Sequence, residues 1–215
     1  HMSARRQRQM CIRDSPGTLV NDAESAVKAA ERLNCPVALK IQSADIPHKS
    51  SAGGVALNLT GNDEIVTSFN TIIQNTKHNN PTASIDGILV QKMVEPGLEV
   101  ILGITNKDGF GPILMVGFGG TGVEASGDVA FALCPVTPKK FENLLEALKG
   151  SILLDKKRHD LPALVRLMTT LSSFAISVQH LISEIDLNPV ILHSPGNGIS
   201  VVDALMVKFD ETSER

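Results

Sequence analysis

The chain has 215 residues, 42% hydrophobic and 20% charged, which excludes a disordered protein and allows one large domain or two small lobes. The formal net charge of −3 speaks against a nucleic-acid or anionic-membrane partner, because both need a positive face. No apolar stretch approaches the ~18 residues that span a bilayer.

Hydrophobic periodicity predicts a chain that mixes hairpin-like strands with helices. Residues 22–34 place Ala and Val at helical spacing behind Asp22, which can cap a helix. In chain order the predicted elements are helix 22–34, strands 37–41 and 55–59, helix 62–77, strands 87–94, 99–105, 113–116 and 123–133, helices 138–148 and 161–181, and strands 185–192 and 199–205. This order favours an α+β fold over a doubly wound parallel sheet.

The two ends are excluded from fold reasoning. His1-Met2 resembles a cloning scar, and residues 3–15 are basic and aperiodic. Within them, residues 10–15 (MCIRDS) resemble a translated sequencing adaptor of the kind found in metagenomic reading frames. We therefore treat residues 1–15 as a tag and non-native leader, and residues 209–215 as a solvated tail.

The three cysteines, Cys11, Cys35 and Cys134, are far apart and form no CxxC motif. We therefore expect neither a disulfide framework nor a zinc site. A reducing cytoplasm is the natural compartment for such a chain.

Lys40, on a predicted strand, precedes a polar loop that ends in Gly53-Gly54. Paired glycines let backbone N–H groups approach phosphate oxygens, and a strand lysine supplies a fixed cation. His48 lies in this loop, where a neutral imidazole can attack phosphorus. The alternative is an ordinary hairpin with a surface lysine and an exposed histidine.

Polar side chains also interrupt two apolar strands near the C-terminal end. Asp186 and Asn188 alternate with apolar residues and share one strand face, and a hairpin would place Asp203 opposite them. Carboxylate and amide oxygens from adjacent strands form a partial shell for Mg²⁺, which phosphates and water complete. The alternative is a set of polar residues at strand ends.

Two further motifs have weaker implications. Residues 117–122 (GFGGTG) contain a dinucleotide-binding spacing, but a strand rather than a helix is predicted to follow, so we discount an NAD site. Around the turn at 96–97, in the segment from Gln91 to Glu99, backbone groups can read an adenine edge while Met93 packs on its face, and Glu99 can accept hydrogen bonds from ribose hydroxyls. An ordinary strand–turn–strand explains the same residues.

Together these motifs resemble one family: the ATP-grasp portion of NDP-forming acyl-CoA synthetases, with relatives in succinyl-CoA synthetase and in acetyltransferase-fused protein acylation enzymes. The resemblance covers residues 16–208. It is carried, in order, by PVALKIQSADIPHKSSAGGVALNL, DGILVQKMVEPGLEVILG, FGPILMVGFGG, DVAF-LCP and EIDLNPV followed by VVDA.

The resemblance implies an ATP-grasp fold with a small lobe at 16–97, a large lobe at 98–208 and a nucleotide cleft between them. It implies the cofactors ATP and Mg²⁺, and a phosphate relay from ATP through a phosphohistidine to an acyl phosphate. A CoA-binding or CoA-ligase domain or subunit would be the partner. The implied site residues are His48 as phosphate acceptor; Lys40, Gly53, Gly54, Gln91, Met93 and Glu99 for ATP; and Asn188 and Asp203 for the metal.

This sequence departs from the family pattern in three ways. Ala132 stands where many members carry arginine, and Ser51 replaces a common acidic residue. Loss of a phosphate-facing arginine would cost ~1.5–3 kcal/mol. The sequence also contains no CoA-binding Rossmann domain. These departures leave open an alternative function as a non-catalytic or regulatory nucleotide-binding lobe of a protein acyltransferase.

Overall fold

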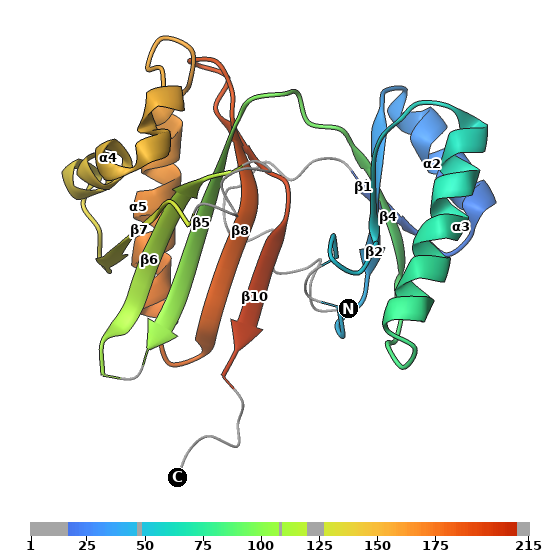
Figure 1. Ribbon diagram of the computed structural model, residues 1–215, viewed down its shortest axis with the longest axis horizontal. Coiled ribbons are helices and arrows are strands. Elements are labelled where there is room, and N and C mark those ends of the chain that lie inside the picture. The colour runs from blue at the N-terminus through green and yellow to red at the C-terminus, as the bar shows by residue number, and fades with distance from the viewer. Residues whose placement is uncertain (1–16, 47–48, 108, 120–126, 210–215) are drawn as a thin grey trace. The chain divides into compact units, whose positions relative to one another are not determined.

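The computed structural model describes residues 17–46, 49–107, 109–119 and 127–209. The fold consists of two compact units, with the division between Val94 and Glu95. Each unit is an antiparallel sheet with helices on one face, as the elements in Figure 1 show. The α+β class is therefore confirmed.

The first unit is built on a four-stranded sheet of order β1-β4-β2-β3, covered on one face by two helices. Alternate residues of the central strands, such as Leu39 and Val90, pack with the helices into one apolar core. The elements are β1 (Gly17–Val20), α2 (Ala23–Leu33), β2 (Val37–Gln42), β3 (Val55–Leu59), α3 (Asn62–Asn79) and β4 (Gly87–Lys92).

Local signals set the limits of these helices. The Asp22 carboxylate accepts from the Ser25 N–H at 2.7 Å and begins α2, as predicted. Asn34 ends α2 in the left-handed region, with φ 48°. Glu64 of α3 reaches back to the backbone N–H groups of Thr60 and Gly61. Short-range bonds thus set both ends of α2 and the start of α3.

The second unit is built on a sheet of order β10-β8-β5-β6-β7, with β9 paired to β8. Helices α4 and α5 cover one face, and aliphatic residues from the strands fill the core beneath them. The elements are β5 (Leu98–Lys107), β6 (Gly111–Phe118), β7 (Val129–Leu133), α4 (Pro138–Ala147), the 3-10 helix η2 (Lys149–Leu153), α5 (Leu161–Ser177), β8 (Ile182–Leu192), β9 (Ile199–Val201) and β10 (Ala204–Lys208).

Two predicted elements have different limits in the structure. Helix α5 ends at Ser177 rather than at 181, because the Asn106 side chain of β5 binds the carbonyl oxygens of Gln179 and Ile182 and holds the turn. The predicted strand 199–205 is broken, since the N–H of Val202 and the carbonyl of Asp203 bond to β8 outside the regular ladders.

Other differences concern short elements and the ends. Strand β1 and helix η2 were not predicted; β1 is a four-residue edge strand, and η2 buries no residue. Part of the predicted strand 123–133 and all of the leader 1–15 lie outside the described residues. Within the described part of the chain, no helix has the length and apolar content to cross a membrane.

Candidate functional site

The sheet of the first unit has a face that α2 and α3 do not cover, which we call the first open face. Lys40 and Gln91 project from it, because they alternate with the core residues Leu39, Ile41 and Val90. Lys40 is only 6% exposed and Gln91 only 5%. A lysine is seldom buried so deeply unless its ammonium group has polar partners or a specific task. The structure thus places two predicted nucleotide-binding residues on one face of one sheet.

The glycine loop packs directly beside Lys40. The Ile41 N–H donates to the Gly54 carbonyl oxygen at 2.8 Å, and Lys40 pairs with Val55 across the sheet. Gly53 has φ +68°, and a Cβ on Gly54 would lie 2.4 Å from the Ile41 side chain. Only glycine satisfies both positions.

The backbone N–H groups of the loop have partners of their own. Gly53 donates to the Ser50 carbonyl at 3.1 Å, and Gly54 donates to the Lys49 carbonyl at 2.8 Å. These two amides are therefore bonded within the loop, and the expectation that N–H groups of the loop approach phosphate oxygens stays a prediction. The glycines close a tight turn next to Lys40. His48, the predicted phosphate acceptor, lies outside the described residues.

The predicted hinge residues fall in different units. Gln91 and Met93 belong to the first, and the Met93 N–H donates to the Pro36 carbonyl at 2.9 Å. Glu99, on β5, belongs to the second unit, where it pairs with Ile191 of β8. The Met93 amide is therefore engaged by its own unit, while Glu99 is exposed.

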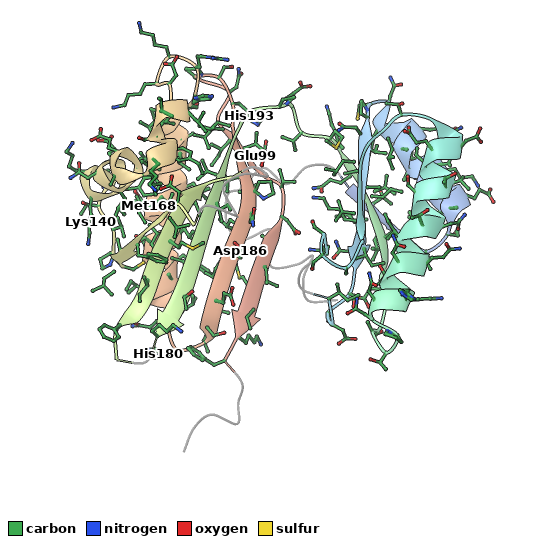
Figure 2. All side chains as sticks on the ribbon, in the orientation of Figure 1. Glu99, Lys140, Met168, His180, Asp186 and His193 are labelled. Carbon is green, nitrogen blue, oxygen red and sulfur yellow. The ribbon has the colours of Figure 1, made fainter. Side chains whose placement is uncertain are left out.

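The second sheet also has a face without helices, the second open face. Asp186 and Asn188 of β8 lie on it, because Ile185, Leu187 and Val190 face the core. Asp186 stands between Gly103 of β5 and Leu205 of β10. Figure 2 shows Glu99 toward one end of this sheet and Asp186 nearer its middle.

The break between β9 and β10 places Asp203 against Asn188. The Asn188 N–H donates to the Asp203 carbonyl oxygen at 3.2 Å, and the Asp203 carboxylate accepts from the Ala204 N–H at 3.0 Å. The predicted metal ligands are therefore neighbours, although Asp203 lies in the irregular link and not on a regular strand.

The donor set on this face fits a magnesium ion that is bound together with phosphate. Among the described residues, no group of three or more His, Cys, Asp or Glu side chains could hold a metal by itself. Mg²⁺ is usually held by one or two carboxylates, with substrate phosphates and water completing its shell. One carboxylate and one amide, from Asp203 and Asn188, match that requirement.

Ala132 bears on the alternative of a non-catalytic lobe. It pairs with Leu114 and is 6% exposed in the core beneath the helices, on the face opposite Asp186. No cation is therefore missing from the second open face at this position. The argument that Ala132 removes a phosphate contact is wrong, and the alternative loses that support.

The described cysteines take no part in either face. Cys35 and Cys134 are free thiols, and Cys134 packs against the second core. Burial raises the pKa of the Cys134 thiol, against smaller lowering contributions from Ser172, Leu114 and Lys140. The thiol therefore stays protonated at neutral pH and is a poor nucleophile.

The glycine run 117–122 begins within strand β6, and the next described element is again a strand, β7. Sequence reasoning gave this run no definite role. Gly117 and Gly119 lie on the second open face, and Gly119 is bonded to Glu99. The glycine-rich run is visible in the sequence, but the sequence could not show that Gly119 would bond to Glu99, a predicted ribose ligand.

Comparison with known proteins points to one family. A family model described as an ATP-grasp domain matches residues 8–207. The chain is 40% identical over 189 residues to a 4-hydroxybutyrate–CoA ligase (ADP-forming) of Nitrosopumilus maritimus, a match that covers 86% of this chain and 27% of that protein. It is 35% identical over 193 residues to the beta subunit of acetate–CoA ligase (ADP-forming) II of Pyrococcus furiosus, covering 88% and 82%.

Solved structures agree with these relatives. The dinucleotide-forming acetyl-coenzyme A synthetase 1 of Candidatus Korarchaeum cryptofilum, in complex with coenzyme A and Ca-AMPCP, aligns with TM-score 0.81 and 36% identity over 91% of this chain and 86% of that chain. Another structure of that synthetase holds Mg-AMPPCP and has its phosphohistidine segment pointing towards the nucleotide site. It aligns with TM-score 0.71 and 32% identity over 93% of this chain and 86% of that one.

Proposed function

This chain belongs to the ATP-grasp domain family, and we propose that it is the ATP-binding part of an ADP-forming acyl-CoA synthetase. It spans about a quarter of the ligase of N. maritimus but most of the beta subunit of P. furiosus. The proposed activity is transfer of the terminal phosphate of ATP to a histidine, on the route to an acyl phosphate and an acyl-CoA.

The observation that carries this proposal is the buried Lys40 on a sheet face without helices. In the proposed complex its ammonium group holds the phosphates of ATP. Gly53 and Gly54 close the turn that packs beside it, and Gln91 and Met93 contact the base. Asn188 and Asp203 would hold Mg²⁺, which would supply Lewis-acid stabilisation of the phosphate oxygens.

His48 is the proposed acceptor. A lone pair on a neutral imidazole nitrogen forms the N–P bond, the bond from the γ-phosphorus to the β,γ-bridging oxygen breaks, and ADP leaves with those electrons. This assignment is supported by the phosphohistidine segment named in the Korarchaeum structure. The phosphoryl group then passes to a carboxylate oxygen of the acid substrate, and the coenzyme A thiol attacks the acyl carbon, so that inorganic phosphate leaves.

The proposed partner is a CoA-binding domain or subunit. Support comes from two relatives, since the P. furiosus protein is named as one subunit and the N. maritimus ligase is far longer than this chain. We also propose a cytoplasmic location, where ATP is abundant and the free thiols of Cys35 and Cys134 stay reduced.

The proposal is tested by incubating the protein with γ-labelled ATP and Mg²⁺, and measuring acid-labile, base-stable label on the protein. The parent protein should become labelled and His48→Ala should not. His78→Ala is the matched control, because His78 is an exposed histidine of the same unit and should keep the label. If calorimetry shows that the parent binds ATP but the parent acquires no label, phosphate transfer is refuted and only nucleotide binding remains.

A further inference from the structure

Gly119 lies directly opposite Glu99 where the β5–β6 pair ends. Val100 and Phe118 are the last residues in register, and the Gly119 N–H then donates to the Glu99 carbonyl oxygen at 2.7 Å. Since Val100 and Phe118 face the core, Glu99 and Gly119 face the other way, onto the second open face. The α-carbon of Gly119 therefore lies beside the Glu99 side chain.

There is no room for a side chain at this position. A Cβ on Gly119 would lie 2.8 Å from the Glu99 Cβ, 3.3 Å from the Glu99 carbonyl carbon and 3.4 Å from Oε2. All three nearest atoms belong to Glu99, and two of them are at the root of the residue. Rotation of the carboxylate alone cannot relieve such a contact, so Glu99 as a whole would have to shift.

The reason for glycine here is space and not backbone conformation. Gly119 does not lie in the left-handed region, in contrast to Gly53 and Gly127. Gly117, two residues earlier on the same face, has different neighbours: a Cβ there would lie 3.0 Å from a Val129 methyl carbon and 3.1 Å from the Asp128 carbonyl oxygen. The two glycines thus offer a matched pair, of which only one touches Glu99.

We propose that Gly119 is a positioning residue for Glu99: its bare α-carbon sets the Glu99 carboxylate where it accepts a hydrogen bond from the 2′-hydroxyl of the nucleotide ribose. The inference rests on the proposed ATP-binding function and adds a determinant of ribose specificity to it. Hydrogen bonds weaken steeply outside their narrow range of length and angle, so a shift of about an ångström at Glu99 removes this bond. The phosphate and metal contacts are made elsewhere and are unaffected.

The test is calorimetric titration of the protein with Mg-ATP and with Mg-2′-deoxy-ATP. The parent should bind ATP about tenfold more tightly, as expected for a hydrogen bond to a charged group. Gly119→Ala should reduce this ratio to less than about threefold, and so should Glu99→Ala. The double variant should match Glu99→Ala, because no carboxylate is left to displace. Gly117→Ala is the packing control and should keep the parent ratio.

Two results separate failure of this inference from failure of the proposed function. If the parent binds neither nucleotide, the proposed function is overturned and this inference with it. If the parent discriminates but Gly119→Ala has the same ratio as the parent, only the positioning role is overturned.

A folding defect in Gly119→Ala still leaves the geometry testable. Combining it with Glu99→Gly removes the nearest atom, the Glu99 Cβ at 2.8 Å, and leaves only the backbone carbonyl carbon at 3.3 Å. Gly119→Ala should therefore lower the melting temperature less in the Glu99→Gly background than in the parent, and an equal loss in both backgrounds would overturn the proposal.

Discussion

The two units share one layout and differ in what their open faces present. Each is an antiparallel sheet with helices on one side and an aliphatic core beneath them. The first open face presents Lys40 and Gln91, whereas the second presents Glu99, Asp186 and Asn188. The covered faces explain why each unit folds, and the open faces present the residues of the proposed site.

The two open faces differ in charge: the first presents the ammonium group of Lys40, and the second presents the carboxylates of Glu99 and Asp186. A nucleotide triphosphate with its metal ion needs a cation for the phosphate oxygens and oxygen ligands for Mg²⁺. In the proposed function, the first open face supplies the cation and the second open face supplies the metal ligands.

The largest expected effect is a loss of stability, and it tests whether the covered face of the second sheet holds the fold together while its open face does not. Phe141 of α4 is fully buried, whereas Phe131 of β7 is 59% exposed. Phe141→Ala should lower the free energy of unfolding by about 3–5 kcal/mol, because it leaves a cavity. Phe131→Ala should cost under about 1 kcal/mol, as is usual for an exposed side chain. Chemical denaturation of both variants checks this, and equal losses would show that the open face is structural.

The next largest effect concerns Asp160, the buried cap of α5. Its carboxylate accepts from the N–H groups of Ala163, Gly196 and Gly198 at 3.1, 2.9 and 3.0 Å. Asp160→Ala should cost about 2 kcal/mol, since it removes a cap and leaves buried donors unpaired. Asp22→Ala at the exposed cap of α2 is the matched control and should cost less. Urea denaturation would measure both.

Asp160 should also make stability depend on pH. Burial raises the pKa of its carboxyl, but the N–H donors Ala163, Gly198 and Gly196, with the charge of Arg166, outweigh burial and lower it. Its stabilisation is therefore complete above the unfolded pKa, about 3.9, and is lost as the pH falls toward the lower folded value. Asp160→Asn should show less loss of stability in this acid range than the parent.

Most of this layout could be predicted from the sequence, because the signals were local. Asp22 predicted the start of α2, and alternation predicted β3. The end of α5 could not be predicted, because it depends on a bond from Asn106, about seventy residues earlier in the chain. Strand β1 was not predicted, because it has only four residues and pairs with β4, which is distant in the sequence.

The candidate site remains a prediction from the sequence. Motif order suggested Lys40, Asn188 and Asp203, and the structure shows their environment. That Gly119 touches Glu99 follows only from the register of β5 and β6, and that Ala132 faces the core follows only from its pairing with Leu114. A residue's face depends on strand register, which a glycine-rich sequence specifies weakly.

The third effect tests the cation of the first open face. Lys40→Met keeps an apolar stem and removes the charge, so the affinity for Mg-ATP should fall about thirtyfold, close to 2 kcal/mol. Lys92→Ala is the control, because Lys92 is an exposed lysine of the neighbouring strand and should bind as the parent does. Calorimetry measures both, and unchanged affinity in Lys40→Met would remove the first open face from the proposed site.

The smallest expected effect tests the second open face through the metal. Asp203→Asn exchanges a carboxylate for an amide of the same shape beside Asn188, so the Mg²⁺ concentration that half-saturates phosphate transfer should rise about tenfold. Glu146→Gln, an equal loss of charge on the exposed side of α4, should leave it unchanged. A lower maximal rate at saturating Mg²⁺, with the same half-saturation, would place Asp203 outside the metal shell. The contribution of the second open face to the proposed function would then rest on Glu99 and not on the metal.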